Sequence, residues 1–133
     1  MLRGTWIGEK EDLTSVMQLR EKIWKRNVED EMDEWSRHLI IDEDGVPIAV
    51  GTVTENLHHR FRFSYLGVVE SKRNQRIGDF LIRIMITDSW EKGAVALELT
   101  ATEETKVFFM KEGFLEVSRE NDECIEMIRE IVY

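Results

Sequence analysis

A short cationic segment at residues 72–78 is the stretch whose residue types most directly suggest chemistry. It contains Lys72, Arg73 and Arg76 and no acid, in a chain whose 18 Lys and Arg against 27 Asp and Glu give a formal net charge of −9. A β-rich run precedes the segment and an apolar helical run follows it. Backbone N–H groups at the start of a helix point outward at the positive end of its dipole, so they favour an anion. The segment predicts a phosphate-binding loop, with a solvated loop that serves solubility as the alternative.

The elements that must position this segment follow a mixed α/β order. Residue periodicity and turn signals predict strands at 5–7, 38–41, 46–53, 61–69, 94–99 and 114–119, and helices at 12–26, 77–90 and 102–112. Asp12 is the expected N-cap of the first helix, and Asp44-Gly45 predicts a hairpin turn. The tail from Cys124 to Tyr133 fits either a helix or a strand.

Length and composition set the limits on function. The 133 residues contain no repeat or linker, so we expect one domain over 1–133. The acidic balance excludes a general nucleic-acid binder and opposes adsorption to anionic membranes. The lone Cys124 excludes a disulfide framework and a cysteine-based zinc site, and the adjacent His58 and His59 lack the spacing of a metal site. We therefore expect no metal. No signal peptide or long apolar run is present, which predicts a cytoplasmic protein.

Two stretches of the sequence resemble the signatures of one protein family. Residues Val68 to Gly78 resemble the acetyl-coenzyme A signature of the GNAT superfamily of N-acetyltransferases, V-x-P-x-x-[QR]-x-x-G-x-[GA]. Residues Thr105 to Phe114 are similar to its second signature, A-x-x-F-Y-x-x-x-G-F. The resemblance covers essentially the whole chain. It implies a GNAT-type α/β fold, with a central, mostly antiparallel twisted sheet flanked by helices and splayed strands at 61–69 and 94–100.

The resemblance also implies a reaction and a binding site. Acetyl-CoA would be the acetyl donor and the primary amine of a small, cationic molecule the acceptor, with direct transfer between them. The pantetheine arm would pair with the backbone around Leu66 to Val68 as an extra strand. The pyrophosphate would bind the N–H groups of Arg73 to Gly78, while Asp79 could instead complement the helix dipole. The implied cofactor-binding residues are Leu66, Val68, Arg73, Asn74, Gln75, Arg76, Ile77, Gly78, Asp79 and Phe109.

Three positions depart from the family pattern. Arg76 and Asn74 stand where the family commonly has glycine. Their Cβ atoms could crowd the phosphates, or the Arg76 guanidinium could donate two hydrogen bonds to phosphate oxygens. Phe109 replaces the tyrosine proposed to protonate the departing thiolate. Because a thiol pKa lies at about 8.5, this loss should slow transfer rather than forbid it. An inactive acyl-CoA-binding module of the same fold is therefore the alternative function.

The acceptor amine needs a base, because an amine with a pKa of about 10.4 is mostly protonated at neutral pH. A carboxylate near the splayed strands, often acting through water, is expected. The base candidates are Glu98, Tyr65 and Glu55, and the alternative for either glutamate is an ordinary surface carboxylate. The acid-rich run Glu29 to Glu34 lies where the resemblance places the acceptor loop, and it is either a solvated loop or a surface that attracts a cationic amine.

The four tryptophans exceed what a small core needs, and exposed ones could mark an interface. They are Trp6, Trp24, Trp35 and Trp90. We therefore predict a homodimer.

Overall fold

A computed structural model describes residues 1–133 and contains a seven-stranded mixed sheet. The strands in chain order are β1 (Leu2–Ile7), β2 (Arg37–Glu43), β3 (Val46–Glu55), β4 (Arg60–Val68), β5 (Ala96–Ala101), β6 (Leu115–Asn121) and β7 (Cys124–Glu130). Their order across the sheet is β1-β2-β3-β4-β5-β7-β6, and only β4 and β5 are parallel. The helices are α1 (Thr14–Trp24), α2 (Ile77–Glu91) and α3 (Lys106–Lys111). The predicted mixed α/β order is confirmed.

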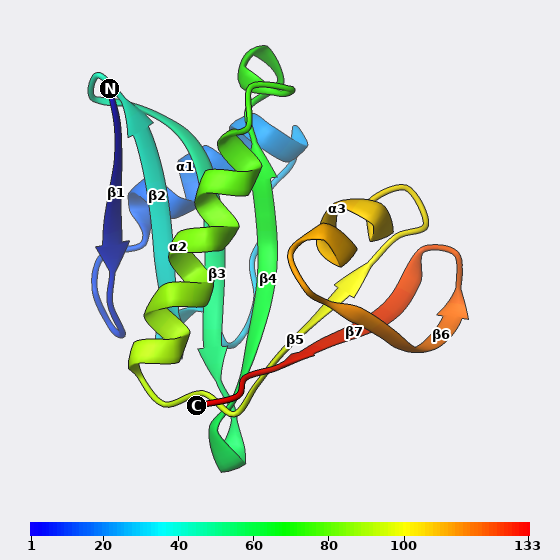
Figure 1. The fold of residues 1–133 in the computed structure, drawn as a ribbon. Helices are drawn as coiled ribbons and strands as arrows, with labels where there is room; N and C mark the ends of the chain where they lie inside the picture. Colours follow the sequence, from blue (N-terminus) through cyan, green and yellow to red (C-terminus); the bar gives the residue numbers. More distant parts are fainter.

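The two longer helices cover opposite faces of β2 to β4. Figure 1 shows α2 across the near face and α1 behind the sheet, while β5, β7 and β6 diverge from β4 with α3 beside them. Apolar side chains from both faces form the core, because alternate residues of a strand point to opposite sides. No helix combines the length and the apolar character needed to cross a bilayer.

The C-terminal tail, for which the sequence left two possibilities, is a strand. β7 lies between β5 and β6, and its Ile125 and Met127 are fully buried on alternate positions. The last helix is shorter than predicted, because Thr102 and Thr105 hydrogen-bond each other in a turn before it begins. Asp12 accepts hydrogen bonds from the N–H and hydroxyl of Thr14 at 3.0 and 2.7 Å, although the boundary residue of α1 is Leu13.

The predicted splay is present between β4 and β5. The two strands pair only at Arg60 with Ala96, Phe61 with Leu97 and Arg62 with Glu98. Beyond Arg62, the side of β4 that faces β5 has no partner strand. On its other side β4 has a bulge against β3, at which Tyr65 adopts a left-handed φ of 52°. The splay and the bulge therefore lie next to each other on one strand.

Candidate functional site

The loop between β4 and α2 has an unusual backbone. After a single 3₁₀ turn at Glu70–Lys72, both Asn74 and Arg76 adopt left-handed φ angles of 64° and 62°. This region of φ favours glycine because a Cβ is crowded there. A glycine would therefore suit these two positions, and this chain adopts the left-handed conformation there with larger residues.

This backbone leaves a run of hydrogen-bond donors free. No N–H group from Asn74 through Asp79 donates to another group of the chain. The first N–H groups of a helix have no partner within it, and the two left-handed residues extend the series backwards into the loop. Except for Gln75, these residues line a cavity of about 500 Å³. We call it the cationic cavity.

Side chains give this cavity a positive balance. Its charged lining consists of Lys72, Arg73, Arg76, Arg83, Lys111, Asp79 and Glu112. The Arg83 Nε lies 3.1 Å from an Asp79 oxygen and 3.6 Å from a Glu112 oxygen. Burial and a hydrogen bond with Asp79 raise the pKa of Glu112, and the same hydrogen bond lowers the pKa of Asp79. Five cations against two acids, together with free N–H groups, suit a phosphate ligand.

Most of the implied cofactor-binding residues meet at this cavity. Its lining includes Val68, Arg73, Asn74, Arg76, Ile77, Gly78 and Asp79. Leu66 and Gln75 do not line it, and the Gln75 amide donates to the Ser71 carbonyl instead.

Phe109 does not line the cavity either. Its side chain is buried between Phe108 and Phe114, at ring-centroid distances of 5.1 and 6.1 Å. The neighbouring Phe108 lines the cavity, and its ring edge lies 3.7 Å from where a Cβ on Gly78 would stand. The position at which the resemblance implies a tyrosine therefore serves the core in this chain.

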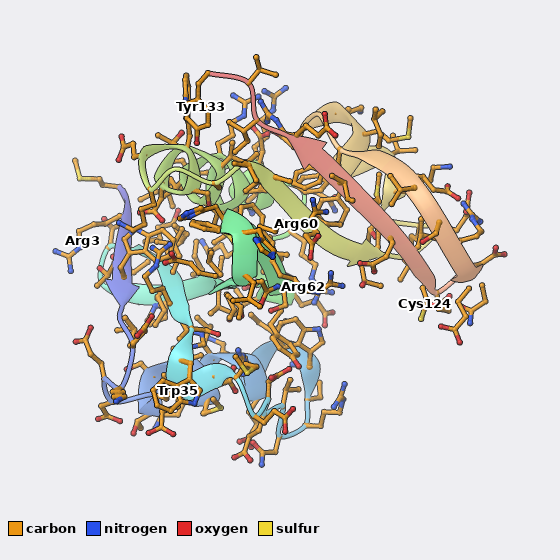
Figure 2. All side chains as sticks on the ribbon, turned by 90° about the horizontal axis from the view of Figure 1, so that it is seen from below. Arg3, Trp35, Arg60, Arg62, Cys124 and Tyr133 are labelled. Atoms are coloured by element: carbon orange, nitrogen blue, oxygen red, sulfur yellow. The ribbon has the colours of Figure 1, made fainter.

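The two glutamate base candidates are both paired with arginine. Glu98 accepts two hydrogen bonds from Arg60, at 3.0 and 2.8 Å, and lies 3.8 Å from Arg62. Figure 2 shows Arg60 and Arg62 beside β4 on the side of β5. Glu55 accepts from the Arg37 Nε at 3.3 Å and is 42% exposed. Of the two, only Glu98 lies at the splay.

Tyr65, the third base candidate, keeps its proton. Its hydroxyl donates to Asp30 at 2.6 Å, and the Arg20 guanidinium lies 4.3 Å from its ring centroid. Burial, followed by the hydrogen bond to Asp30, raises the pKa of Tyr65 to about 12. The phenol is therefore neutral near pH 7 and is not a base there.

A buried polar network beneath Tyr65 escaped the sequence analysis. Arg20 is fully buried and donates to both carboxylate oxygens of Asp33, at 2.8 and 2.9 Å, and to the Thr52 hydroxyl at 2.9 Å. His38 bridges the Thr52 hydroxyl and the Asp33 carbonyl. Because a carbonyl only accepts, the His38 Nε2 carries the proton and Nδ1 accepts from Thr52. Burial lowers the pKa of His38, which agrees with a neutral ring.

A second, smaller cavity lies above this network. It measures about 270 Å³, and we call it the polar cavity. Its lining residues are Asp30, Met32, Asp33, Ser36, Thr52, Thr54, Asn56, Arg62, Ser64 and Tyr65. The acid-rich run is a loop that leads into a 3₁₀ helix at Asp33–Trp35. Two of its carboxylates face this cavity, and Asp33 is buried rather than solvated. The sequence signal for Asp33 was Arg20, a charged residue on the apolar face of the first helix.

No sequence-based family model matches this chain, and no curated protein matches it by sequence. Solved structures do match it along nearly its whole length. An acetyltransferase of the GNAT family from Staphylococcus aureus superposes with a TM-score of 0.76 at 13% identity, covering 96% of this chain and 99% of the other. The chain has the GNAT fold.

Two further GNAT-fold matches extend the comparison. An acyl-CoA N-acyltransferase from Pseudomonas aeruginosa gives a TM-score of 0.82 at 19% identity, with 97% of this chain and 99% of that chain covered. The PaiA N-acetyltransferase from Thermoplasma acidophilum, solved in complex with coenzyme A, gives 0.77 at 14% identity, with 98% and 99% covered. The fold is thus shared at low sequence identity.

Proposed function

We propose that this protein is an acetyl-CoA-dependent N-acetyltransferase that transfers acetyl directly to a primary amine of a small, cationic acceptor. The observation that carries this proposal is the run of free N–H groups from Asn74 to Asp79, which opens onto the cationic cavity at the end of a splayed strand. Pyrophosphate would accept from these N–H groups, with Arg76 beside it. Arg76 forms no ion pair within the chain, so its guanidinium is available.

The open side of β4 supports the same proposal. Beyond Arg62 the strand has no neighbour on the β5 side, so its N–H and C=O groups there can pair with the amides of the pantetheine arm. The arm would then run from the cationic cavity along β4 toward the splay. This path would bring the thioester to the end of the gap, where Glu98 and Arg62 face each other.

The transfer step needs no covalent intermediate. The acceptor ammonium gives up one proton, its nitrogen attacks the thioester carbonyl, and a C–N bond replaces the C–S bond. The departing thiolate then takes up a proton. Cys124 lies at the hairpin turn opposite Asn121, at the far tip of β7 from the splay (Figure 2), so it is not placed as a nucleophile. Among the base candidates we favour Glu98, because it alone lies at the splay and can accept a proton.

A second function is favoured by one specific observation. Phe109 has no proton to donate and is buried in the core, so the chain supplies no acid at that position to the departing thiolate. The protein could instead bind acyl-CoA without transferring the acyl group, as a sensor or a partner subunit. The two functions share the cationic cavity and differ only in turnover.

Two measurements separate these functions. Thermal unfolding with saturating acetyl-CoA tests binding, since a ligand at about 100 times its Kd stabilises the folded state by about 2.7 kcal/mol. Release of free thiol in the presence of a panel of amines tests transfer. Stabilisation with amine-dependent thiol release supports the enzyme, and stabilisation without it supports the binding module. No stabilisation by acetyl-CoA would overturn both.

The homodimer stays a prediction. Trp6 and Trp24 pack against the core, whereas Trp35 and Trp90 are about half exposed. Sedimentation of the protein would test whether a second copy covers either of the exposed pair.

A further inference from the structure

The polar cavity is connected to the splay, and its lining is rich in neutral hydrogen-bonding groups. Ser36, Thr54, Asn56 and Ser64 contribute hydroxyl or amide groups to it. Arg62 lines the same cavity and lies 3.8 Å from Glu98, the residue at which β4 and β5 part. A molecule in this cavity therefore lies against the site proposed for acetyl transfer.

One carboxylate in the polar cavity has no ion-pair partner. Asp33 is paired with Arg20 at 2.8 Å, and Arg62 is paired with Glu126 at 2.8 Å. Asp30, in contrast, forms no ion pair. Its two oxygens accept from the Tyr65 hydroxyl at 2.6 Å and from the Met32 N–H at 2.8 Å. The cavity therefore presents one carboxylate without an ion-pair partner, held in place by two donors.

A cationic group bound at Asp30 would be a poor nucleophile. Hydrogen bonds to a carboxylate favour its ionised form, and those from Tyr65 and Met32 lower the pKa of Asp30. An anion beside an amine favours the ammonium form, which has no lone pair with which to attack a thioester. Because its lowered pKa makes Asp30 a weak proton acceptor, we assign the reacting amine to a different group, which lies nearer Glu98.

We infer that Asp30 anchors a second, non-reacting ammonium group of the acceptor, so that the acceptor is a small diamine whose other amine reaches the splay. This inference rests on the proposed transferase function. The neutral hydroxyl groups of Ser36, Thr54 and Ser64 would line the path of the acceptor's hydrocarbon chain between its two amines. The charge of Asp30 would also repel amines that carry a carboxylate near the anchoring position.

The test compares α,ω-diamines of increasing chain length with monoamines of matching length, first in the unchanged protein. One diamine length should give a lower KM than its monoamine. Asp30→Asn keeps an oxygen for the Tyr65 hydroxyl but removes the charge. It should raise the KM for that diamine roughly ten- to hundredfold, the worth of a charged hydrogen bond, and leave the KM for monoamines nearly unchanged.

Two further variants sharpen the result. Glu31→Gln removes the same charge from the same acidic run, but Glu31 is exposed and does not line the cavity, so the diamine KM should hardly move. Tyr65→Phe keeps the charge and removes one donor to it, so its effect on the diamine KM should be smaller than that of Asp30→Asn. Unchanged monoamine kinetics in Asp30→Asn also report that the variant is folded.

Several outcomes would overturn the inference while leaving the transferase function intact. These are equal KM values for diamines and monoamines, an equal loss for both in Asp30→Asn, and a loss in Glu31→Gln as large as that in Asp30→Asn. Failure of the unchanged protein to release thiol with any amine would instead overturn the transferase function, and the inference with it.

Discussion

The cationic cavity and the polar cavity are built in opposite ways. The first is made largely by one contiguous stretch, residues 72–79, and offers backbone donors at the start of a helix. The second is made by side chains from β3, β4 and the loop before β2, and it rests on the buried Arg20 of α1. One is a local conformation of the chain, and the other exists only once four elements have packed together.

This difference predicts different responses to mutation. The cationic cavity depends on φ angles and helix-end N–H groups, so single changes there should alter ligand binding more than folding. The polar cavity depends on a buried ion pair, and removal of one partner leaves an uncompensated charge in a low dielectric. Substitutions in the buried network beneath the polar cavity should therefore lower the free energy of unfolding more than they alter ligand binding.

The largest expected effect follows from removal of the buried cation. Arg20→Met leaves Asp33 buried without its partner, and we expect the free energy of unfolding to fall by about 3–5 kcal/mol. Urea unfolding followed by circular dichroism measures the loss. Arg119→Met is the matched control, because Arg119 pairs with three acids at the surface and its loss should barely move the midpoint. Equal shifts in the two variants would contradict the distinction.

The same contrast explains what could be predicted from the sequence. The loop at 72–78 and the two signatures are contiguous, so a local pattern was enough to find the cationic cavity and the GNAT fold. The pairing of Arg20 with Asp33 spans thirteen positions, and Thr52 lies farther along still. No periodicity joins these residues, because their proximity is set by the packing of α1 on the sheet.

Phe109 and the base candidates show a second limit of sequence reading. The family pattern gave Phe109 a place at the cofactor, yet its ring faces the core and Phe108 meets the cavity. Glu98 and Glu55 have suitable chemistry and suitable strand positions. Both carboxylates are paired with arginines, Glu55 with Arg37 of β2 and Glu98 with Arg60 of β4. These pairs follow from the register between strands, which cannot be derived from the sequence.

The next largest effect should fall on coenzyme A binding without loss of stability. Arg76→Glu reverses a charge beside the free N–H groups, and we expect the Kd for coenzyme A to rise about tenfold or more, equivalent to about 1.4 kcal/mol. Arg76→Ala keeps the backbone donors, so its Kd should rise only a few fold, by roughly 0.5 kcal/mol. Isothermal calorimetry measures both. A loss in Arg76→Ala as large as in Arg76→Glu would show that the guanidinium, rather than the backbone, dominates the cavity.

A substitution at Gly78 should have a smaller effect, and it should change coenzyme A affinity without lowering stability. Gly78 does not have a positive φ, and a Cβ there would meet the Phe108 ring edge at 3.7 Å and a Val68 methyl at 3.9 Å, both ordinary contacts. Gly78→Ala should therefore leave stability unchanged or raise it by up to about 1 kcal/mol. If phosphate approaches this helix start closely, the added methyl should weaken coenzyme A binding roughly threefold. Unaltered affinity would place the phosphates elsewhere in the cavity.

The smallest effect concerns the acidic pair inside the cationic cavity. Burial and the hydrogen bond with Asp79 raise the pKa of Glu112, so its carboxyl takes up a proton at a higher pH than an ordinary glutamate. Protonation removes a negative charge that faces the ligand together with Asp79, Arg83 and Lys111. Affinity of the unchanged protein for coenzyme A should thus approach that of Glu112→Gln as the pH falls.

At pH values above the pKa of Glu112, where its carboxyl is ionised, Glu112→Gln should bind coenzyme A about two- to threefold more tightly, because the Arg83 guanidinium 3.6 Å away already offsets part of the charge. The phosphates of the ligand titrate equally in both experiments, so the ratio of the two Kd values isolates the carboxyl. A ratio that stays constant from neutral to mildly acidic pH would mean that Arg83, rather than the proton, neutralises Glu112. In that case the two acids would be part of the scaffold that holds Arg83, and the cavity would owe its positive balance to its cations without ion pairs, Arg73, Arg76 and Lys111.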